Sequence, residues 1–164
     1  MPGVRIADAI FIGLGATLVM DVWNLFLMRA FGISSLSYCL LGRWLLHIPA
    51  GTFRHSNIRT ASQKKHECAA GRVAHYSIGI VFALIFLLLV SDEWLARPTA
   101  IPAILFGVAT VVFPYFIMQP SLGLGIASAK AANPARARLK SLVTHTVFGA
   151  GMYLCGLIIA LLPL

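Results

Sequence analysis

Charged residues, and acids above all, are scarce in this sequence. Only 11% of its 164 residues are charged and five are Asp or Glu, whereas an average soluble domain carries about 25% charged residues. Hydrophobic residues make up 59% of the chain. A chain of this length cannot bury so much apolar surface in a water-soluble globule. The composition therefore excludes an ordinary soluble domain and indicates a lipid environment.

Cysteine is also scarce, with three residues at Cys39, Cys68 and Cys155. The odd number and the lack of a C-x-x-C spacing predict neither a disulfide framework nor a zinc knuckle. We expect Cys155 to be a small packing residue within a helix. If the loop that holds Cys39 and Cys68 is cytoplasmic, these two thiols lie in a reducing compartment.

What the sequence has in excess is positive charge, with 13 Lys and Arg and a formal net charge of +8. Such a surplus can indicate nucleic-acid binding. In so apolar a chain, basic loops are instead the usual signature of membrane orientation. We therefore expect the lipid bilayer as the partner of this chain, and no nucleic acid.

Four apolar runs are each close to the roughly 20 residues that cross a bilayer as a helix. They cover about residues 6–28, 73–90, 100–118 and 142–164. The first loop also contains the apolar stretch SYCLLGRWLLHIPAG, which is too short to span. The predicted fold class is an all-α membrane protein: one integral membrane domain, 1–164, forming a four-transmembrane-helix bundle with an interfacial or re-entrant helix in the first loop.

The basic residues set the expected orientation. Loops 29–72 and 119–141 hold 11 of the 13 Lys and Arg. Such loops stay in the cytoplasm, so both loops are predicted to be cytoplasmic and both termini to lie outside.

Polar residues gather at the cytoplasmic side of the predicted bundle. Asp21 lies on the first span, His75 begins the second, Gln119 closes the third and His145 begins the fourth. Ionisable groups are costly in hydrocarbon and commonly mark function. The first loop adds further polar candidates, namely Arg43, His47, His55 and Glu67.

Several interpretations of these residues stay open. Asp21, His75 and His145 match the ligand preferences of a divalent metal, zinc or iron. Two imidazoles from neighbouring helices could instead ligate a haem iron. Haem is the weaker of the two metal hypotheses. A proton relay or a polar-substrate site would use the same groups. In the structural interpretation, they only hydrogen-bond one another and nearby backbone carbonyls.

Five segments together resemble a known family. They are GLGATLVMDVW, LGRWLLHIPAGTFRH, HYSIGIVFA, MQPSLGLGIASA and SLVTHTVFGAGMY. The chain resembles a bacterial family of small four-helix inner-membrane proteins classed as a domain of unknown function. The resemblance implies four helices and a location in the bacterial inner membrane, and it brings no activity, substrate or cofactor. The positions that match the polar elements of the family are Asp21, Arg43, His47, His55, Glu67, His75, Gln119 and His145.

Three functions are compatible with the sequence. The first is a small permease or carrier that binds a metal ion or small polar ligand through Asp21, Arg43, His47, His55, Glu67 and Gln119. The second is a membrane-embedded metal-dependent enzyme with Glu67 as base, although no catalytic residue can be assigned and the sequence leans away from an enzyme. The third is an accessory subunit of a larger membrane complex, packing through the glycine-rich faces of the first and fourth spans. A homodimer is a further prediction.

Overall fold

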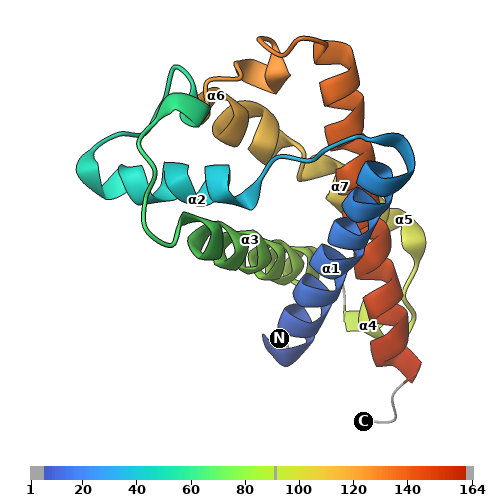
Figure 1. Ribbon diagram of the computed structural model, residues 1–164. Coiled ribbons are helices and arrows are strands. Elements are labelled where there is room, and N and C mark those ends of the chain that lie inside the picture. The colour runs from blue at the N-terminus through green and yellow to red at the C-terminus, as the bar shows by residue number, and fades with distance from the viewer. Residues whose placement is uncertain (1–5, 91, 162–164) are drawn as a thin grey trace. The chain divides into compact units, whose positions relative to one another are not determined.

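A computed structural model describes residues 6–90 and 92–161, without the side chain of Asp92, and contains helices but no strand within those ranges. Figure 1 shows the order of the elements along the chain. They are α1 (Ile6–Phe31), α2 (Tyr38–His47), η1 (Ile48–Ala50), η2 (Ile58–Thr60), α3 (Glu67–Leu89), α4 (Asp92–Ala96), α5 (Ala100–Ala109), η3 (Pro114–Met118), α6 (Gln119–Ser121), η4 (Ile126–Ser128) and α7 (Pro134–Leu161).

Four of the helical stretches are long and apolar enough to cross a membrane, which confirms the predicted fold class. They are Ile6–Phe31, Glu67–Leu89, Ala100–Ser121 and Pro134–Leu161. The second and fourth helices begin six and eight residues before the predicted spans, because polar residues of the loops continue the helix. The last three residues of the predicted fourth span, 162–164, lie outside the described part of the chain.

The described chain clusters into two compact units, and α3 and α7 contribute a segment to each of them. Unit 1 contains residues 1–34, 76–110 and 143–164. Unit 2 contains residues 35–75 and 111–142. Each unit has its own hydrophobic core and is described by itself below.

Small residues bring the helices of unit 1 close together. A Cβ added to Gly13 of α1 would clash with the backbone of Ile80 on α3, and one added to Gly151 of α7 would press on Ala16 of α1. Gly149 of α7 meets the backbone of Ala103 on α5 in the same way. The glycine-rich faces predicted to bind a partner are therefore used for contacts within this chain.

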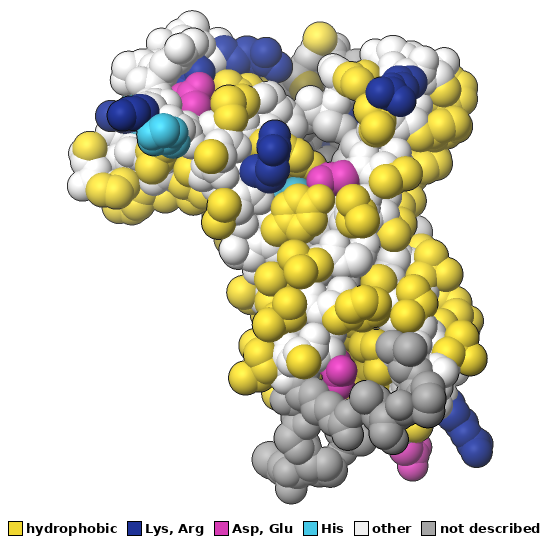
Figure 2. Space-filling view, turned by 60° about the horizontal axis from the view of Figure 1, so that its bottom comes forward, with side chains coloured by type: hydrophobic (Ala, Val, Ile, Leu, Met, Phe, Trp, Pro, Cys, Tyr) yellow, Lys and Arg dark blue, Asp and Glu magenta, His cyan; other side chains and the backbone are white. Residues whose placement is uncertain are grey.

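The core of unit 1 is apolar and aromatic. Ile12 and Met152 are fully buried, and Phe86 lies edge-on to Trp94 with ring centroids 4.7 Å apart. The indole N–H of Trp94 donates to the Thr99 carbonyl at 3.0 Å. Outside this core, large hydrophobic side chains are exposed, and Figure 2 shows them over much of one face. Exposed apolar surface of this kind suits contact with lipid.

In unit 2, α2 confirms the helix predicted within the first loop. Ser37 caps its start by accepting a hydrogen bond from the Cys39 N–H, and Gly51 follows η1 with a φ of 76° that favours glycine. The buried core beside it consists of Leu40, Leu41, Trp44, Ile58 and Leu122. These apolar groups explain why a ten-residue helix is stable in a loop.

A second glycine contact lies between α2 and the start of α3. A Cβ on Gly42 would clash with the backbone of Glu67 and Gly71, and a Cβ on Gly71 would clash with the Tyr38 carbonyl. The two helices therefore cross at their glycines. No larger residue fits this crossing without a shift of the backbone.

Candidate functional site

Asp21 is the first polar group of unit 1. It lies on α1, and one of its carboxylate oxygens accepts a hydrogen bond from the Tyr76 hydroxyl of α3 at 3.0 Å. Thr17, one turn earlier on α1, bonds the Gly13 carbonyl at 2.7 Å and packs against Gly79. Along the contact between α1 and α3, small residues are therefore followed by the hydrogen-bonded pair of Asp21 and Tyr76.

Unit 1 also contains three buried polar atoms that have no hydrogen-bond partner among the described residues. They are the indole nitrogen of Trp23, the amide oxygen of Asn24 and the hydroxyl of Thr144. An unpaired buried polar group costs about 1–3 kcal/mol, so three in one compact unit need an explanation.

Helix geometry places Trp23 and Thr144 on facing stripes of α1 and α7. Gly151 of α7 packs on Ala16 and Val19 of α1. Trp23 follows Val19 by one turn on the same face of α1. On α7, Thr144 precedes Gly151 by seven residues, two helical turns, and so shares its face. Both unpaired atoms therefore lie at the same end of the α1–α7 contact.

His145 follows Thr144 and is held by Thr110. The Thr110 hydroxyl donates its single hydrogen to the Gly107 carbonyl at 2.6 Å. The contact of 2.8 Å between the same hydroxyl and His145 Nδ1 must then be a hydrogen bond donated by the ring. His145 therefore carries a hydrogen on Nδ1, and this nitrogen does not present a lone pair.

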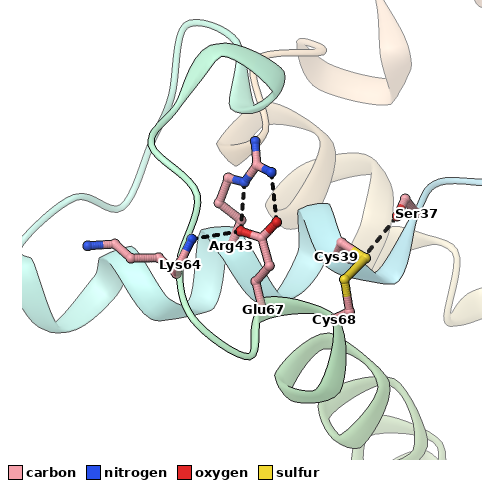
Figure 3. The surroundings of a disulfide bond; sticks show 6 residues. All are labelled: Ser37, Cys39, Arg43, Lys64, Glu67 and Cys68. Atoms are coloured by element: carbon pink, nitrogen blue, oxygen red, sulfur yellow. Dashed lines mark hydrogen bonds and ion pairs between the residues drawn. A yellow bond between two sulfur atoms is a disulfide. The ribbon is translucent and has the colours of Figure 1, made fainter.

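Unit 2 contains a buried ion pair between Arg43 of α2 and Glu67 of α3 (Figure 3). Arg43 donates from Nη2 to Oε1 at 2.7 Å and from Nε to Oε2 at 2.9 Å. The backbone N–H of Lys64 also donates to Oε2 at 2.9 Å. Both oxygens of Glu67 are thus used in binding the loop to α2, which gives no support to Glu67 as a catalytic base.

The guanidinium of Arg43 also binds η2 and the first residue of the loop that follows it. Its Nη1 donates to the carbonyls of Ile58, Arg59 and Ala61 at 3.2–3.3 Å. The hydrogen bond with Glu67 raises the pKa of Arg43, whereas burial acts in the opposite direction. Arg43 is therefore a charged, fully engaged structural group rather than an open ligand contact.

His47 and His55 extend this polar cluster. His47 Nδ1 lies 2.8 Å from the Arg43 carbonyl, so it carries the hydrogen, and Nε2 lies 3.1 Å from the Ser62 hydroxyl. The ring of His55 is 5.0 Å from that of His47, and its buried Nε2 has no partner within residues 6–90 and 92–161. Burial, and then the charge of His47, lower the pKa of His55.

The other two predicted residues of unit 2 have separate contacts. His75 stacks on Tyr38 with ring centroids 4.5 Å apart. The Gln119 side-chain nitrogen donates to the Ser141 hydroxyl at 3.4 Å. The buried Gln119 oxygen is left without a partner in the described structure.

The structure thus brings together Arg43, His47, His55 and Glu67, as one cluster in unit 2. The metal set is divided, with Asp21 and His145 in unit 1 and His75 in unit 2. Across the described residues, no group of three or more His, Cys, Asp or Glu side chains is arranged to hold a metal ion. The metal and haem hypotheses therefore stay predictions.

The expectation that the chain contains no disulfide is wrong. Cys39 of α2 and Cys68 of α3 form one, 29 residues apart in the sequence (Figure 3). The third cysteine, Cys155, is free and buried, as expected. A short repeat could have indicated the pair, because CLLGR at 39–43 and CAAGR at 68–72 each place a glycine three residues after the cysteine. These are the two glycines of the helix crossing.

Charge is distributed very unequally between the two units. Unit 2 contains ten Lys and Arg against the single acid Glu67, a formal net charge of +9. Unit 1 contains three basic and four acidic residues, a net charge of −1. The whole positive surplus of the chain therefore belongs to unit 2.

A family model described as "Protein of unknown function (DUF2938)" matches residues 10–159. The chain belongs to this family. The match includes both units and every polar residue discussed above, which confirms the resemblance to a family of unknown function. Comparison of this DUF2938 protein with curated proteins and with solved structures finds no match.

Proposed function

We propose that this DUF2938 protein binds a small polar ligand within the membrane, in unit 1, and acts as a small permease or carrier. The observation that carries the proposal is the set of buried, unpaired atoms of Trp23, Asn24 and Thr144. Trp23 and Asn24 follow Asp21 on α1, Thr144 lies on α7, and both helices are long and apolar enough to cross a bilayer. Hydrocarbon cannot pair such groups, whereas a polar ligand can.

The unpaired atoms define the chemistry of the ligand. The Trp23 indole only donates, the Asn24 oxygen only accepts and the Thr144 hydroxyl does both. The Asp21 carboxylate favours a positive charge nearby. The site therefore suits a small molecule with an amine or ammonium group and at least one hydrogen-bond acceptor, such as an amino alcohol.

The same proposal includes an orientation. The +9 charge of unit 2 supports cytoplasmic loops by the positive-inside rule, and with them periplasmic termini in a bacterial inner membrane.

The test is a thermal-shift screen of purified protein in detergent, with a panel of small amines, amino alcohols and polyols as probes. A stabilising probe is then titrated against Thr144→Val, which keeps the shape of the side chain, and against Trp23→Phe, which removes the indole N–H together with the five-membered ring. We expect each variant to bind at least about 5-fold more weakly, the value of one hydrogen bond of roughly 1 kcal/mol.

Thr17→Val is the matched control, because the Thr17 hydroxyl is buried in the same unit but already bonds the Gly13 carbonyl. Its affinity for the probe should equal that of the wild type. In proteoliposomes, Asp21→Asn should abolish uptake of the same probe. Unchanged probe affinity in both Thr144→Val and Trp23→Phe, or unchanged uptake in Asp21→Asn, would refute the proposal.

A further inference from the structure

The disulfide of unit 2 joins two helices at their first turns. Cys39 is the second residue of α2, and Cys68 is the second residue of α3 (Figure 3). The positive end of a helix dipole stabilises a thiolate there, which makes the sulfur more reactive toward thiol–disulfide exchange. Both cysteines of the pair have this setting.

The surroundings of Cys68 are accessible and positively charged. Cys68 is exposed and Cys39 is half-buried. Lys64, Lys65 and Arg72 lie within four residues of Cys68, and the neighbouring Glu67 is neutralised by Arg43. Accessible cysteines in such basic surroundings are the ones that react with oxidants, whereas inert structural cysteines are buried.

The α2–α3 junction has connections besides the disulfide. The Arg43–Glu67 ion pair joins the same two helices with bonds of 2.7 and 2.9 Å. The crossing of Gly42 and Gly71 adds direct backbone contact. Breaking the sulfur–sulfur bond would leave these contacts in place, so the reduced form keeps the junction.

From these observations we infer that Cys39 and Cys68 form a reversible dithiol–disulfide site that exchanges with small disulfides of the oxidised-glutathione class. This site goes beyond the proposed ligand binding in unit 1. The positive charge of unit 2 favours a cytoplasmic location. Disulfides of cytoplasmic proteins are usually redox-sensing or catalytic, so a reversible disulfide agrees with that location.

The exchange takes two steps and two electrons. The thiolate of Cys68, the more exposed sulfur, attacks one sulfur of the small disulfide, forms a mixed disulfide and releases one small thiolate. The Cys39 thiolate then attacks the Cys68 sulfur, closes the Cys39–Cys68 bond and releases the second small thiolate. The dithiol is oxidised, the small disulfide is reduced to two thiols, and the two cysteine protons pass to them through water.

The experiment traps thiols in cells that express the full chain in a Cys155→Ala background, so that Cys39 and Cys68 are the two remaining cysteines. Cells are quenched in acid before and after a pulse of diamide, which oxidises the glutathione pool. The protein is then labelled with a maleimide polymer that shifts its mobility. We expect fewer than about 20% oxidised chains at rest, more than about 80% after the pulse, and a return during recovery.

Purified Cys39→Ser protein then tests the order of the steps. With oxidised glutathione, it should stop at a mixed disulfide on Cys68, visible by mass, and Cys68→Ser should form its adduct at least about 5-fold more slowly. Chains that are fully oxidised at rest would show a permanent structural disulfide and overturn the inference. Chains that stay reduced throughout the diamide pulse would overturn it as well.

Discussion

The two units of this protein differ in which of their buried polar groups are paired. In unit 2, Arg43 and Glu67 are buried as a pair, and their donors and acceptors meet partners on α2, α3 and the loop between them. In unit 1, Trp23 and Thr144 bury polar atoms that meet no partner among the described residues. The buried charges are thus fully paired, while single neutral groups of the described chain are left unpaired, three of them in unit 1 and two, His55 and Gln119, in unit 2.

This difference separates a structural role from a functional one. A satisfied polar network fixes one arrangement of the chain but has no spare hydrogen-bonding capacity for a ligand. Unpaired groups destabilise the fold unless something else pairs them. Hence Arg43 and Glu67, which the sequence suggested as ligand-binding residues, stabilise unit 2. The candidate site is instead formed by Trp23, Asn24 and Thr144 of unit 1.

The largest expected effect comes from breaking the pair in unit 2. Glu67→Gln leaves the Arg43 charge buried without its partner, and such a loss typically costs about 3–5 kcal/mol of unfolding free energy. We expect a large drop in thermal midpoint in detergent, together with rapid proteolysis of the loop between η2 and α3.

The double variant Arg43→Met, Glu67→Leu is the control, because it removes both charges and keeps the volume close to that of the original pair. It should recover most of the lost stability. If Glu67→Gln unfolds at the wild-type temperature, the pair does not hold unit 2 and the contrast between the units fails.

The sequence contains enough information for the fold and for part of the site. The four apolar runs predict the four long helices, and Pro49 with Gly51 predicts the end of the helical segment in the first loop. The Cys39–Cys68 pair was missed because a separation of 29 residues matches no known spacing rule. Trp23 and Thr144 were missed because an indole and a hydroxyl look ordinary in an apolar helix, and only packing shows that they are unpaired.

A smaller effect comes from comparing two buried threonines of unit 1. Thr17→Val breaks the 2.7 Å bond to the Gly13 carbonyl and should cost about 1 kcal/mol. Thr144→Val removes an unpaired hydroxyl, so in the absence of ligand it should be neutral or stabilising by up to about 1 kcal/mol. Thermal unfolding of both variants in detergent measures the difference, and an equal loss of stability would mean that the Thr144 hydroxyl has a partner.

The smallest effect concerns His55, which with Gln119 is one of two described residues of unit 2 that have a buried, unpaired side-chain atom. Burial and then the charge of His47 lower its pKa in the folded protein, and its Nε2 has no partner in the described structure. Because the unfolded chain binds this proton more readily, stability falls as the pH drops below about 6.5, the usual histidine pKa, toward the lower folded value.

His55→Gln should remove this pH dependence while keeping a polar side chain of similar reach. Between pH 7.5 and pH 5, we expect the thermal midpoint of the variant to fall less than that of the wild type. The difference between the two shifts should be no more than about 3 °C. Gln63→Ala, an exposed change in the same connection between α2 and α3, is the control for general effects of pH on this segment. An identical pH profile in His55→Gln and wild type would show that the His55 ring has a partner in the folded protein.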